Sequence, residues 1–232
     1  MSQNPADTGN DAPASSAAAP RTEEPATSSQ RERRRRILDA TLALATKGGY
    51  EAVQMRAVAE KAEVAVGTLY RYFPSKVHLL VSALAREFQR LDQRTERTSP
   101  PGDTAQERMK VVVEMITKAM QREPNLTEAM TRAFMFADAS VATEVEEVGY
   151  HMDRIIARAM AQGEPDDVQL SIARVISDVW MSNLVSWLTR RSSAADVNTR
   201  LGLTIDLLLG TDDSPRRARL HSSLAQGDGP AS

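Results

Sequence analysis

The chain has 232 residues, of which 41% are hydrophobic and 26% are charged, as in an ordinary globular protein. It contains no cysteine, which excludes a disulfide scaffold, a thiol nucleophile and a zinc–thiolate site. No apolar run approaches the roughly 18 residues that a membrane span needs, and the first residues lack the layout of a signal peptide. We therefore expect a cytoplasmic protein that does not associate with membranes.

The net charge of −2 conceals an uneven distribution along the chain. Residues 31–98 carry 14 basic and 8 acidic side chains, whereas residues 99–232 carry 14 basic and 19 acidic ones. A compact basic segment on an otherwise acidic chain indicates a surface that binds a polyphosphate such as nucleic acid. Local charge imbalance is also common without such a partner, so charge alone leaves both interpretations open.

The two ends of the chain are predicted to be disordered tails. Residues 1–30 and 211–232 consist mostly of small and polar residues with Pro or Gly, and they cannot bury enough apolar surface to offset their chain entropy. Between the tails, apolar residues recur with a helical period, and no alternating strand pattern is found. We expect an all-α fold with a small basic module at residues 31–80 and a larger helical domain at 81–210.

The basic module has the pattern of a helix-turn-helix. A glycine pair, Gly48-Gly49, is expected to end its first helix, and Ser75 to cap the long helix that follows the module. The helices expected before Ser75 span residues 33–47, 55–62 and 66–72. Two short helices joined by a tight turn and braced by another place the second of them in the major groove of DNA.

The side chains expected to contact DNA lie mainly on the second and third helices. Ala59 and Gly67 are small where the paired helices would cross, and Gly67 would also let the backbone approach the groove. Thr68 can reach a phosphate or a thymine methyl, and Arg71 a guanine edge or a phosphate. The arginines at 33–36 can reach the backbone or the minor groove, or form a solvated helix start. The candidates are Arg33, Arg34, Gln54, Met55, Arg56, Val66, Gly67, Thr68, Tyr70, Arg71, Tyr72 and Lys76.

Residues 48–80 resemble the DNA-binding domain of the TetR family of bacterial transcriptional regulators, most specifically in the run GTLYRYFPSK at 67–76. The resemblance implies three N-terminal helices, a helical ligand-binding and dimerisation domain, and double-stranded operator DNA as a partner. Three residues depart from the family pattern: Glu63 in the turn where Gly is frequent, Ala65 where Ser caps the third helix, and Gln54 where Thr is common. Glu63 must therefore avoid a positive φ or accept strain.

A wider resemblance, over most of residues 31–209, is to a repressor of cholesterol-catabolism genes within this family. It implies an acyl-CoA or steroid-type effector, in particular a coenzyme A thioester of a cholesterol-derived steroid acid. A TetR-type regulator of fatty-acid or efflux genes with another apolar effector is the alternative. A ligand-free structural DNA-binding protein is a rival from another class.

Catalysis has little support in the sequence. The three histidines, His78, His151 and His221, are scattered, and the chain has no GxSxG motif, no HExxH motif and no Gly-rich phosphate loop. Adjacent acid pairs such as Asp166-Asp167 diverge by about 100° on a helix and do not form a site. A helical lipid-binding enzyme is thus a weak rival, and we expect no enzyme activity, no cofactor and no metal site.

The larger domain is rich in methionine and aromatic residues that could line an adaptable apolar cavity. The same side chains, at helical spacing, could equally form an ordinary core. The cavity candidates are Met109, Val112, Met115, Ile116, Met130, Phe134, Trp180 and Leu184. An acyl-CoA would also need arginines for its phosphates, but the sequence does not rank Arg122, Arg132, Arg154, Arg158 and Arg174.

The apolar stripes at residues 172–188 and 197–208 are too extensive for one face of a monomer. The family resemblance implies that the last two helices pair with their copies in a homodimer, which predicts a near-palindromic operator with half-sites about one helical turn apart. The interface candidates are Ile172, Val175, Val179, Trp187, Leu201, Ile205 and Leu208. We expect the effector to release the operator through the helix from Ser75 to about Thr98.

Overall fold

The computed structural model describes residues 28–161 and 163–210, and in this part of the chain helix is the only regular structure. The all-α prediction is confirmed. The helices are α1 (Ser28–Ala52), α2 (Met55–Lys61), α3 (Val66–Tyr72), α4 (Lys76–Thr95), α5 (Ala105–Arg122), α6 (Pro124–Met135), α7 (Ala142–Met160), α8 (Asp167–Leu188) and α9 (Ala194–Leu209). The predicted tails lie outside the described residues, except that α1 begins at Ser28, inside the predicted first tail.

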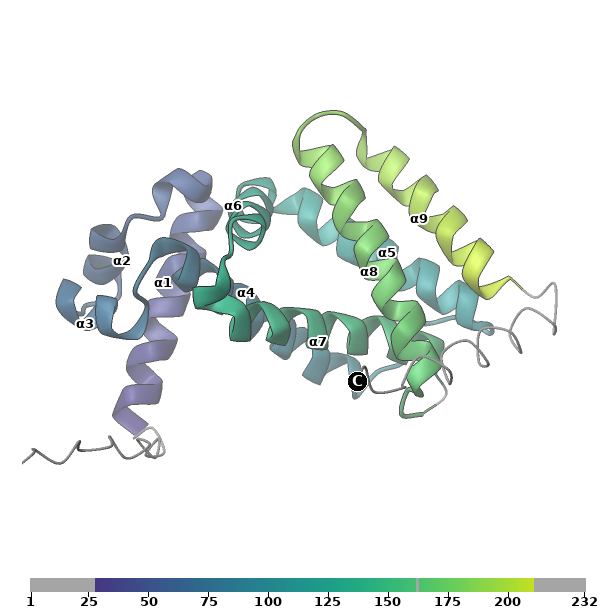
Figure 1. Ribbon diagram of the computed structural model, residues 1–232, viewed down its shortest axis with the longest axis horizontal. Helices are drawn as coiled ribbons and strands as arrows, with labels where there is room; N and C mark the ends of the chain where they lie inside the picture. The colour runs from purple at the N-terminus through teal and green to yellow at the C-terminus, as the bar shows by residue number, and fades with distance from the viewer. Residues whose placement is uncertain (1–27, 162, 211–232) are drawn as a thin grey trace, which may run out of the picture.

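The helices form an elongated molecule (Figure 1). Helices α1, α2 and α3 lie at one end, and α8 and α9 lie at the other. Helix α4 leaves the small module and runs beside α7 into the larger domain, while α6 packs against α1. Two connections therefore join the small module to the rest of the molecule: the continuous helix α4 and the contact between α1 and α6.

Side-chain caps fix where several helices begin. The Ser75 Oγ accepts a hydrogen bond from the backbone N–H of His78 at 3.0 Å, as predicted, and starts α4. Thr104 and Glu107 form a reciprocal capping box at the start of α5. Similar boxes start α8 and α9, at Asp166 with Gln169 and at Ser193 with Asp196.

Two local features differ from the sequence-based expectation. Gly48 and Gly49 do break the helical geometry, with φ of +66° at Gly49, but the chain continues for another helical turn to Ala52. Helix α6 was not predicted, because Pro124 was interpreted only as a break. Pro124 instead occupies the first turn of α6, where its missing N–H has no helical partner to lose.

The core of the small module extends beyond residues 31–80. Its buried residues include Ile37, Leu69 and Phe73 from the module itself. The same cluster contains Ala129, Met130 and Ala133 of α6, which are 0%, 6% and 0% exposed. Helix α6 therefore completes the core of the small module, although it lies within the predicted larger domain.

The turn between α2 and α3 ends α2 with a left-handed residue. Glu63 has φ of +54°, its N–H donates to the Glu60 carbonyl at 3.1 Å, and the Val64 N–H donates to the Ala59 carbonyl at 2.9 Å. This is the Schellman arrangement, which is usually closed by glycine. The strain that the sequence raised as a possibility is thus present. Ala65 makes no side-chain cap for α3.

Glu63→Gly should stabilise the free protein. Glycine adopts the left-handed conformation without the steric cost that Glu63 bears, so we expect a gain of about 1 kcal/mol, or a melting temperature about 2–4 °C higher. Glu63→Ala is the matched control, because it removes the carboxylate near Arg36 but keeps the Cβ atom. An equal gain in the alanine variant would show that charge, and not backbone strain, was relieved.

Candidate nucleic-acid interface and internal cavity

The outer surface of α2 and α3 presents most of the side chains predicted to contact DNA. Buried Leu69 and Phe73 hold α3 against the module core, and this leaves its opposite face to solvent. Arg56 and Arg71 form no ion pair with any residue that the structure describes. Of the candidates, Arg34, Gln54, Arg56, Val66, Gly67, Tyr70 and Arg71 are exposed, and Arg33, Met55, Thr68, Tyr72 and Lys76 are half-buried.

Three of the half-buried candidates are partly committed to contacts within the protein. Met55 and Tyr72 pack against the module core. The Lys76 ammonium lies 3.8 Å from the centre of the Tyr50 ring, with the Arg132 guanidinium 4.2 Å from the same ring. Burial lowers the pKa of Lys76, an effect that the nearby Glu51 carboxylate opposes. Lys76 therefore helps to hold the start of α4 in place.

The absence of a side chain at Gly67 is not required by helix packing. A Cβ atom built on Gly67 would meet nothing within 4 Å, so the expectation that it allows α2 and α3 to cross closely is wrong. Ala59, by contrast, is 1% exposed and belongs to the packed core. The open space above Gly67 is on the exposed face of α3, which agrees with the other expectation, close approach of the backbone to a groove.

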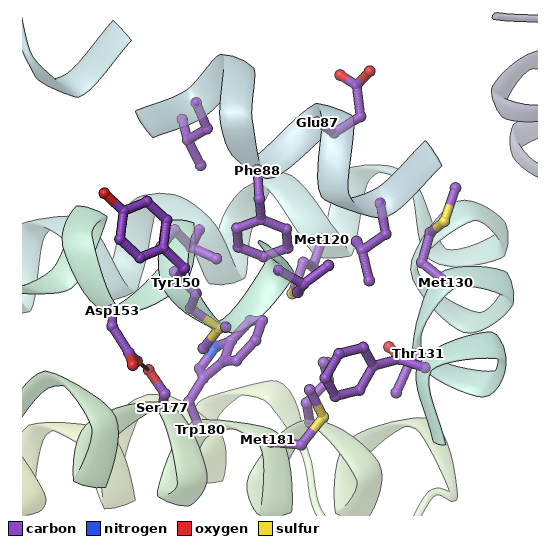
Figure 2. Close-up of a pocket in the computed structure, with 18 of the residues that line it drawn as sticks. Glu87, Phe88, Met120, Met130, Thr131, Tyr150, Asp153, Ser177, Trp180 and Met181 are labelled. Carbon is purple, nitrogen blue, oxygen red and sulfur yellow. Dashed lines mark hydrogen bonds between the residues drawn. The ribbon is translucent and has the colours of Figure 1, made fainter. Parts of the chain in front are cut away.

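The larger domain encloses a cavity of about 1050 Å³. Side chains of α4, α5, α6, α7 and α8 line it, and Phe88, Met120, Trp180 and Met181 project into its middle (Figure 2). Small-molecule sites usually have volumes of about 300–1000 Å³, so this cavity is at the large end of that range. Its mostly apolar lining suits a large hydrophobic ligand.

The cavity includes six of the eight residues predicted to line it, namely Met115, Ile116, Met130, Phe134, Trp180 and Leu184. The prediction is wrong for Met109 and Val112, which are 0% and 3% exposed and belong to the core with residues of α8 and α9. They lie in the first half of α5, whereas only its second half reaches the cavity. Phe88 and Leu91 of α4 were missed, although they stand on the apolar stripe of that helix.

A hydrogen-bonded polar pair, Ser177 and Asp153, lies in the mostly apolar lining. The Ser177 hydroxyl donates to Asp153 Oδ1 at 3.0 Å, and Arg174 Nε lies 3.4 Å from Asp153 Oδ2. Burial raises the pKa of Asp153, while the Ser177 hydrogen bond and the Arg174 charge act in the opposite direction. Figure 2 shows this pair beside Tyr150, at one side of the cavity.

Only two of the five arginines considered for a phosphate-bearing ligand line the cavity. Arg154 lies within 3.5 Å of Asp92 and 3.7 Å of Glu96, so its charge is already paired. The Arg174 side chain is 74% exposed and makes only the contact with Asp153. Arg174 is therefore the guanidinium that a ligand at this opening can engage.

Helix α4 is attached to α7 at two points. Asp92, 4% exposed, accepts hydrogen bonds from Arg158 and pairs with His151 Nδ1 at 2.8 Å. Nearer the small module, His78 Nε2 lies 2.7 Å from Glu144 Oε1. These contacts fix α4 along the wall of the cavity.

Helix α6 is attached to α1 by polar contacts in addition to the shared core. The Tyr50 N–H donates to Glu128 Oε2 at 3.1 Å, and Arg132 pairs with Glu51 at 2.9 Å. The Asn125 amide donates to the carbonyls of Thr46 and Lys47 at 3.3 and 3.4 Å. Helix α6, which contributes Met130 to the cavity lining, is therefore also bonded to the small module.

The apolar surface of α8 and α9 differs in part from the prediction. Val175 is 47% exposed, and Ile172, Val179, Trp187 and Leu208 are half-buried. The prediction is wrong for Leu201 and Ile205, which are 0% exposed because that stripe of α9 faces the core of its own chain. The outward stripe contains Leu203 and Leu207 instead, 59% and 64% exposed.

Within the described ranges, no helix combines the length and apolar character that crossing a membrane requires. Among the same residues, no three His, Asp or Glu side chains gather in a way that could hold a metal ion.

Comparison with known proteins assigns both parts of the chain to one family. Residues 37–83 match the model described as bacterial regulatory proteins, tetR family, and residues 102–208 match a tetracyclin repressor-like C-terminal domain. The chain belongs to the TetR family. It is a transcription regulator and not an enzyme.

Individual TetR relatives cover most of the chain. The HTH-type transcriptional repressor KstR of Rhodococcus jostii is 71% identical over 188 residues, which are 81% of this chain and 87% of the relative. A TetR transcriptional regulator from Rhodococcus sp. RHA1 has a solved structure with a TM-score of 0.70 and 30% identity, covering 80% of this chain and all of that one. Thermus thermophilus FadR in complex with lauroyl-CoA shares the fold, with a TM-score of 0.59 and 18% identity, over 78% of this chain and 97% of the FadR chain.

Gly67→Ala should separate folding from DNA binding. The new methyl group meets no neighbour and alanine favours helix, so we expect the free protein to gain about 0.5–1 kcal/mol. Operator affinity should fall, by about tenfold or more, because the methyl group keeps the α3 backbone from the groove. Gly149→Ala, another helical glycine with open space, is the control and should keep its operator affinity. Undiminished operator binding by the Gly67 variant would contradict this role.

Proposed function

We propose that this chain is a homodimeric repressor that binds a near-palindromic operator and releases it when a large apolar effector fills the cavity. We propose further that it controls steroid-catabolism genes and that the effector is a CoA thioester of a steroid acid. The proposal rests on one observation: two helices belong both to the cavity and to the DNA-binding module. Helices α4 and α6 line the cavity, and both also belong to the core of the module that presents α3.

The proposed DNA contacts follow from exposure and charge. Arg56 and Arg71 are unpaired among the described residues and stand on the face of α2 and α3, where they can bind phosphates or a guanine edge. Gln54 and Tyr70 are exposed beside them and can donate hydrogen bonds to phosphates. The remaining sequence candidates, from Arg33 to Lys76, are proposed as flanking contacts.

The proposed effector follows from the cavity and from the relatives. An apolar space of about 1050 Å³ suits a fused ring system with a side chain, and Trp180 and Phe88 offer flat surfaces for it. The KstR repressors are 65–71% identical to this chain over 80–81% of its length. FadR of Thermus thermophilus, which has the same fold, was solved in complex with lauroyl-CoA. Arg174, exposed at the opening, is the proposed contact for a CoA phosphate.

The proposed release mechanism is a population shift. A ligand that wedges between α4, α6 and α8 binds best to a conformer in which α4 or α6 has moved. Because α4 continues from the small module and α6 bonds to α1, such movement changes the spacing of the two recognition helices in the dimer. The sequence pointed only to α4 as the coupling element; the contacts of α6 with α1 add a second route.

Operator binding with and without effector tests this function. The intact protein would be titrated, at fixed salt, onto a palindromic site from a steroid-catabolism promoter and onto a scrambled duplex. We expect specific binding that a steroid-acid CoA thioester abolishes at saturation and that stearoyl-CoA leaves in place.

Each other outcome identifies an alternative. Release by stearoyl-CoA in place of the steroid thioester would favour a fatty-acid regulator. Specific binding that ignores both ligands would leave the repressor without its proposed effector. Equal affinity for both duplexes, with only a steep dependence on salt, would favour a structural DNA-binding protein.

Leu207→Lys should weaken the dimer without unfolding the chain. Leu207 is exposed in the protomer, and we propose that it lies, with Val175 and Leu203, in the interface between copies. A buried lysine facing its own copy would shift the protein towards monomer in sedimentation velocity and reduce operator affinity. Met135→Lys, at an apolar residue of similar exposure on α6, is the control. A Leu207 variant that remains dimeric at low micromolar concentration would place the interface elsewhere.

A further inference from the structure

The cavity wall contains a hydroxyl that faces the cavity and has no hydrogen-bond partner among the described residues. Thr131 lies on α6, is 6% exposed and lines the cavity. Among the residues that the structure describes, none forms a hydrogen bond with its hydroxyl. Helical threonines commonly donate to the carbonyl four residues earlier. Buried Thr41 and Thr117 do so, each at 2.8 Å, whereas Thr131 does not.

The other serine and threonine hydroxyls that line the cavity already have partners, and that of Ser171 donates to the Asp167 carbonyl at 2.8 Å. Thr127, one turn earlier on α6, donates to the Met120 carbonyl at 3.0 Å, and Ser177 is bonded to Asp153. A ligand that fills the cavity covers this hydroxyl, and the covered hydroxyl costs free energy unless the ligand supplies the missing partner. A ligand with an oxygen atom near Thr131 can therefore pair with its hydroxyl, whereas a pure hydrocarbon cannot.

Thr131 stands on the α6 side of the cavity, opposite Tyr150 (Figure 2). Its neighbours in the α6 wall, Thr127 and Met130, are buried, whereas Tyr150 is 57% exposed and the Arg174 side chain is 74% exposed. Figure 2 shows Thr131 across the cavity from Tyr150, with Phe88 and Trp180 between them. A ligand whose thioester lies near Arg174 would therefore bring its opposite, leading end towards Thr131.

We propose that the Thr131 hydroxyl binds an oxygen substituent at the leading end of the effector and so selects oxygenated ring systems over plain acyl chains. The hydroxyl donates to a ring ketone or accepts from a ring hydroxyl. This inference rests on the proposed function, because it assumes that the effector occupies the cavity with its thioester towards Arg174. A fatty acyl chain ends in a methyl group, which leaves Thr131 unpaired and loses the selectivity.

The position of Thr131 also connects recognition to release. It lies on α6 between Glu128, which accepts from the Tyr50 N–H, and Phe134, which lines the cavity. A hydrogen bond to the ligand at this point acts on the helix that holds α1. A saturating oxygenated ligand should therefore release the operator more completely than its oxygen-free analogue.

Thr131→Val tests the proposal, because it replaces the hydroxyl with a methyl group of similar size. Binding to the full-length dimer would be measured calorimetrically for three CoA thioesters of one steroid acid. They bear a ketone, a hydroxyl or no oxygen on the ring farthest from the acid. The unmodified protein should prefer an oxygenated ligand by about 3- to 10-fold. Thr131→Val should lose this preference, and Thr131→Ser should keep it.

The thermal stability of the empty protein separates ligand recognition from damage to the fold. Thr131→Val should melt at about the same temperature as the unmodified protein, since the hydroxyl that it removes makes no hydrogen bond with a described residue. Thr117→Val is the matched control at a buried threonine outside the cavity, whose hydroxyl is bonded to the Val113 carbonyl. It should leave the ligand preference unchanged.

Each unexpected result contradicts a different proposal. Equal affinity of the unmodified protein for all three thioesters, or an intact preference in Thr131→Val, overturns the role of Thr131 while leaving the repressor function standing. Absence of binding by all three thioesters contradicts the proposed steroid effector and this inference with it. A loss of preference in Thr117→Val as well would assign the effect to general loosening of the domain.

Discussion

The packing of α6 into the core of the small module is the constraint on which the other properties of the molecule depend. A small module in which two of the helices, α2 and α3, have only 7 residues each has little apolar surface of its own, and Ala129, Met130 and Ala133 supply a wall that it lacks. Met130 also lines the cavity. A ligand that displaces Met130 therefore disturbs the core that holds Leu69 and Phe73 under α3, and no separate transmission device is needed.

The α4–α7 and α6–α1 contacts differ in their charged groups. Asp92 is buried with Arg158, Arg154 and His151 of α7 against it, and moving α4 away from α7 would separate this carboxylate from all three partners. The α4–α7 pair is therefore stiff along the cavity. The α6–α1 contact has more exposed charges: the Arg132 side chain is 42% exposed and its Glu51 partner 77%. Exposed pairs contribute little, so the attachment of α6 to α1 depends mainly on the apolar core that they share.

The sequence predicted the elements well but not how each apolar stripe is used. Helical periodicity and the capping residue Ser75 depend on local chemistry, and the Ser75 cap was predicted correctly. Whether a stripe faces its own core, a cavity or a second chain depends on the helices around it. Leu201 and Leu207 lie on the same helix and are both leucines, yet one is buried and the other is 64% exposed. Only the position of α5 and α8 distinguishes them, and no local pattern encodes it.

The charges around the cavity indicate which part of an acyl-CoA can provide specificity. Its lining includes the carboxylates Glu87, Glu123, Glu146, Asp153 and Asp178, against the guanidiniums of Arg154 and Arg174. Arg154 is already paired, so a phosphate-bearing group at the opening meets one available cation among several like charges. Such a group gains little from this protomer, and salt should affect its binding only modestly because the repulsions are screened together with the attraction. Discrimination must then come from the apolar walls and from the few polar groups inside them, where water is excluded and one unmatched hydroxyl is enough to separate two otherwise similar ligands.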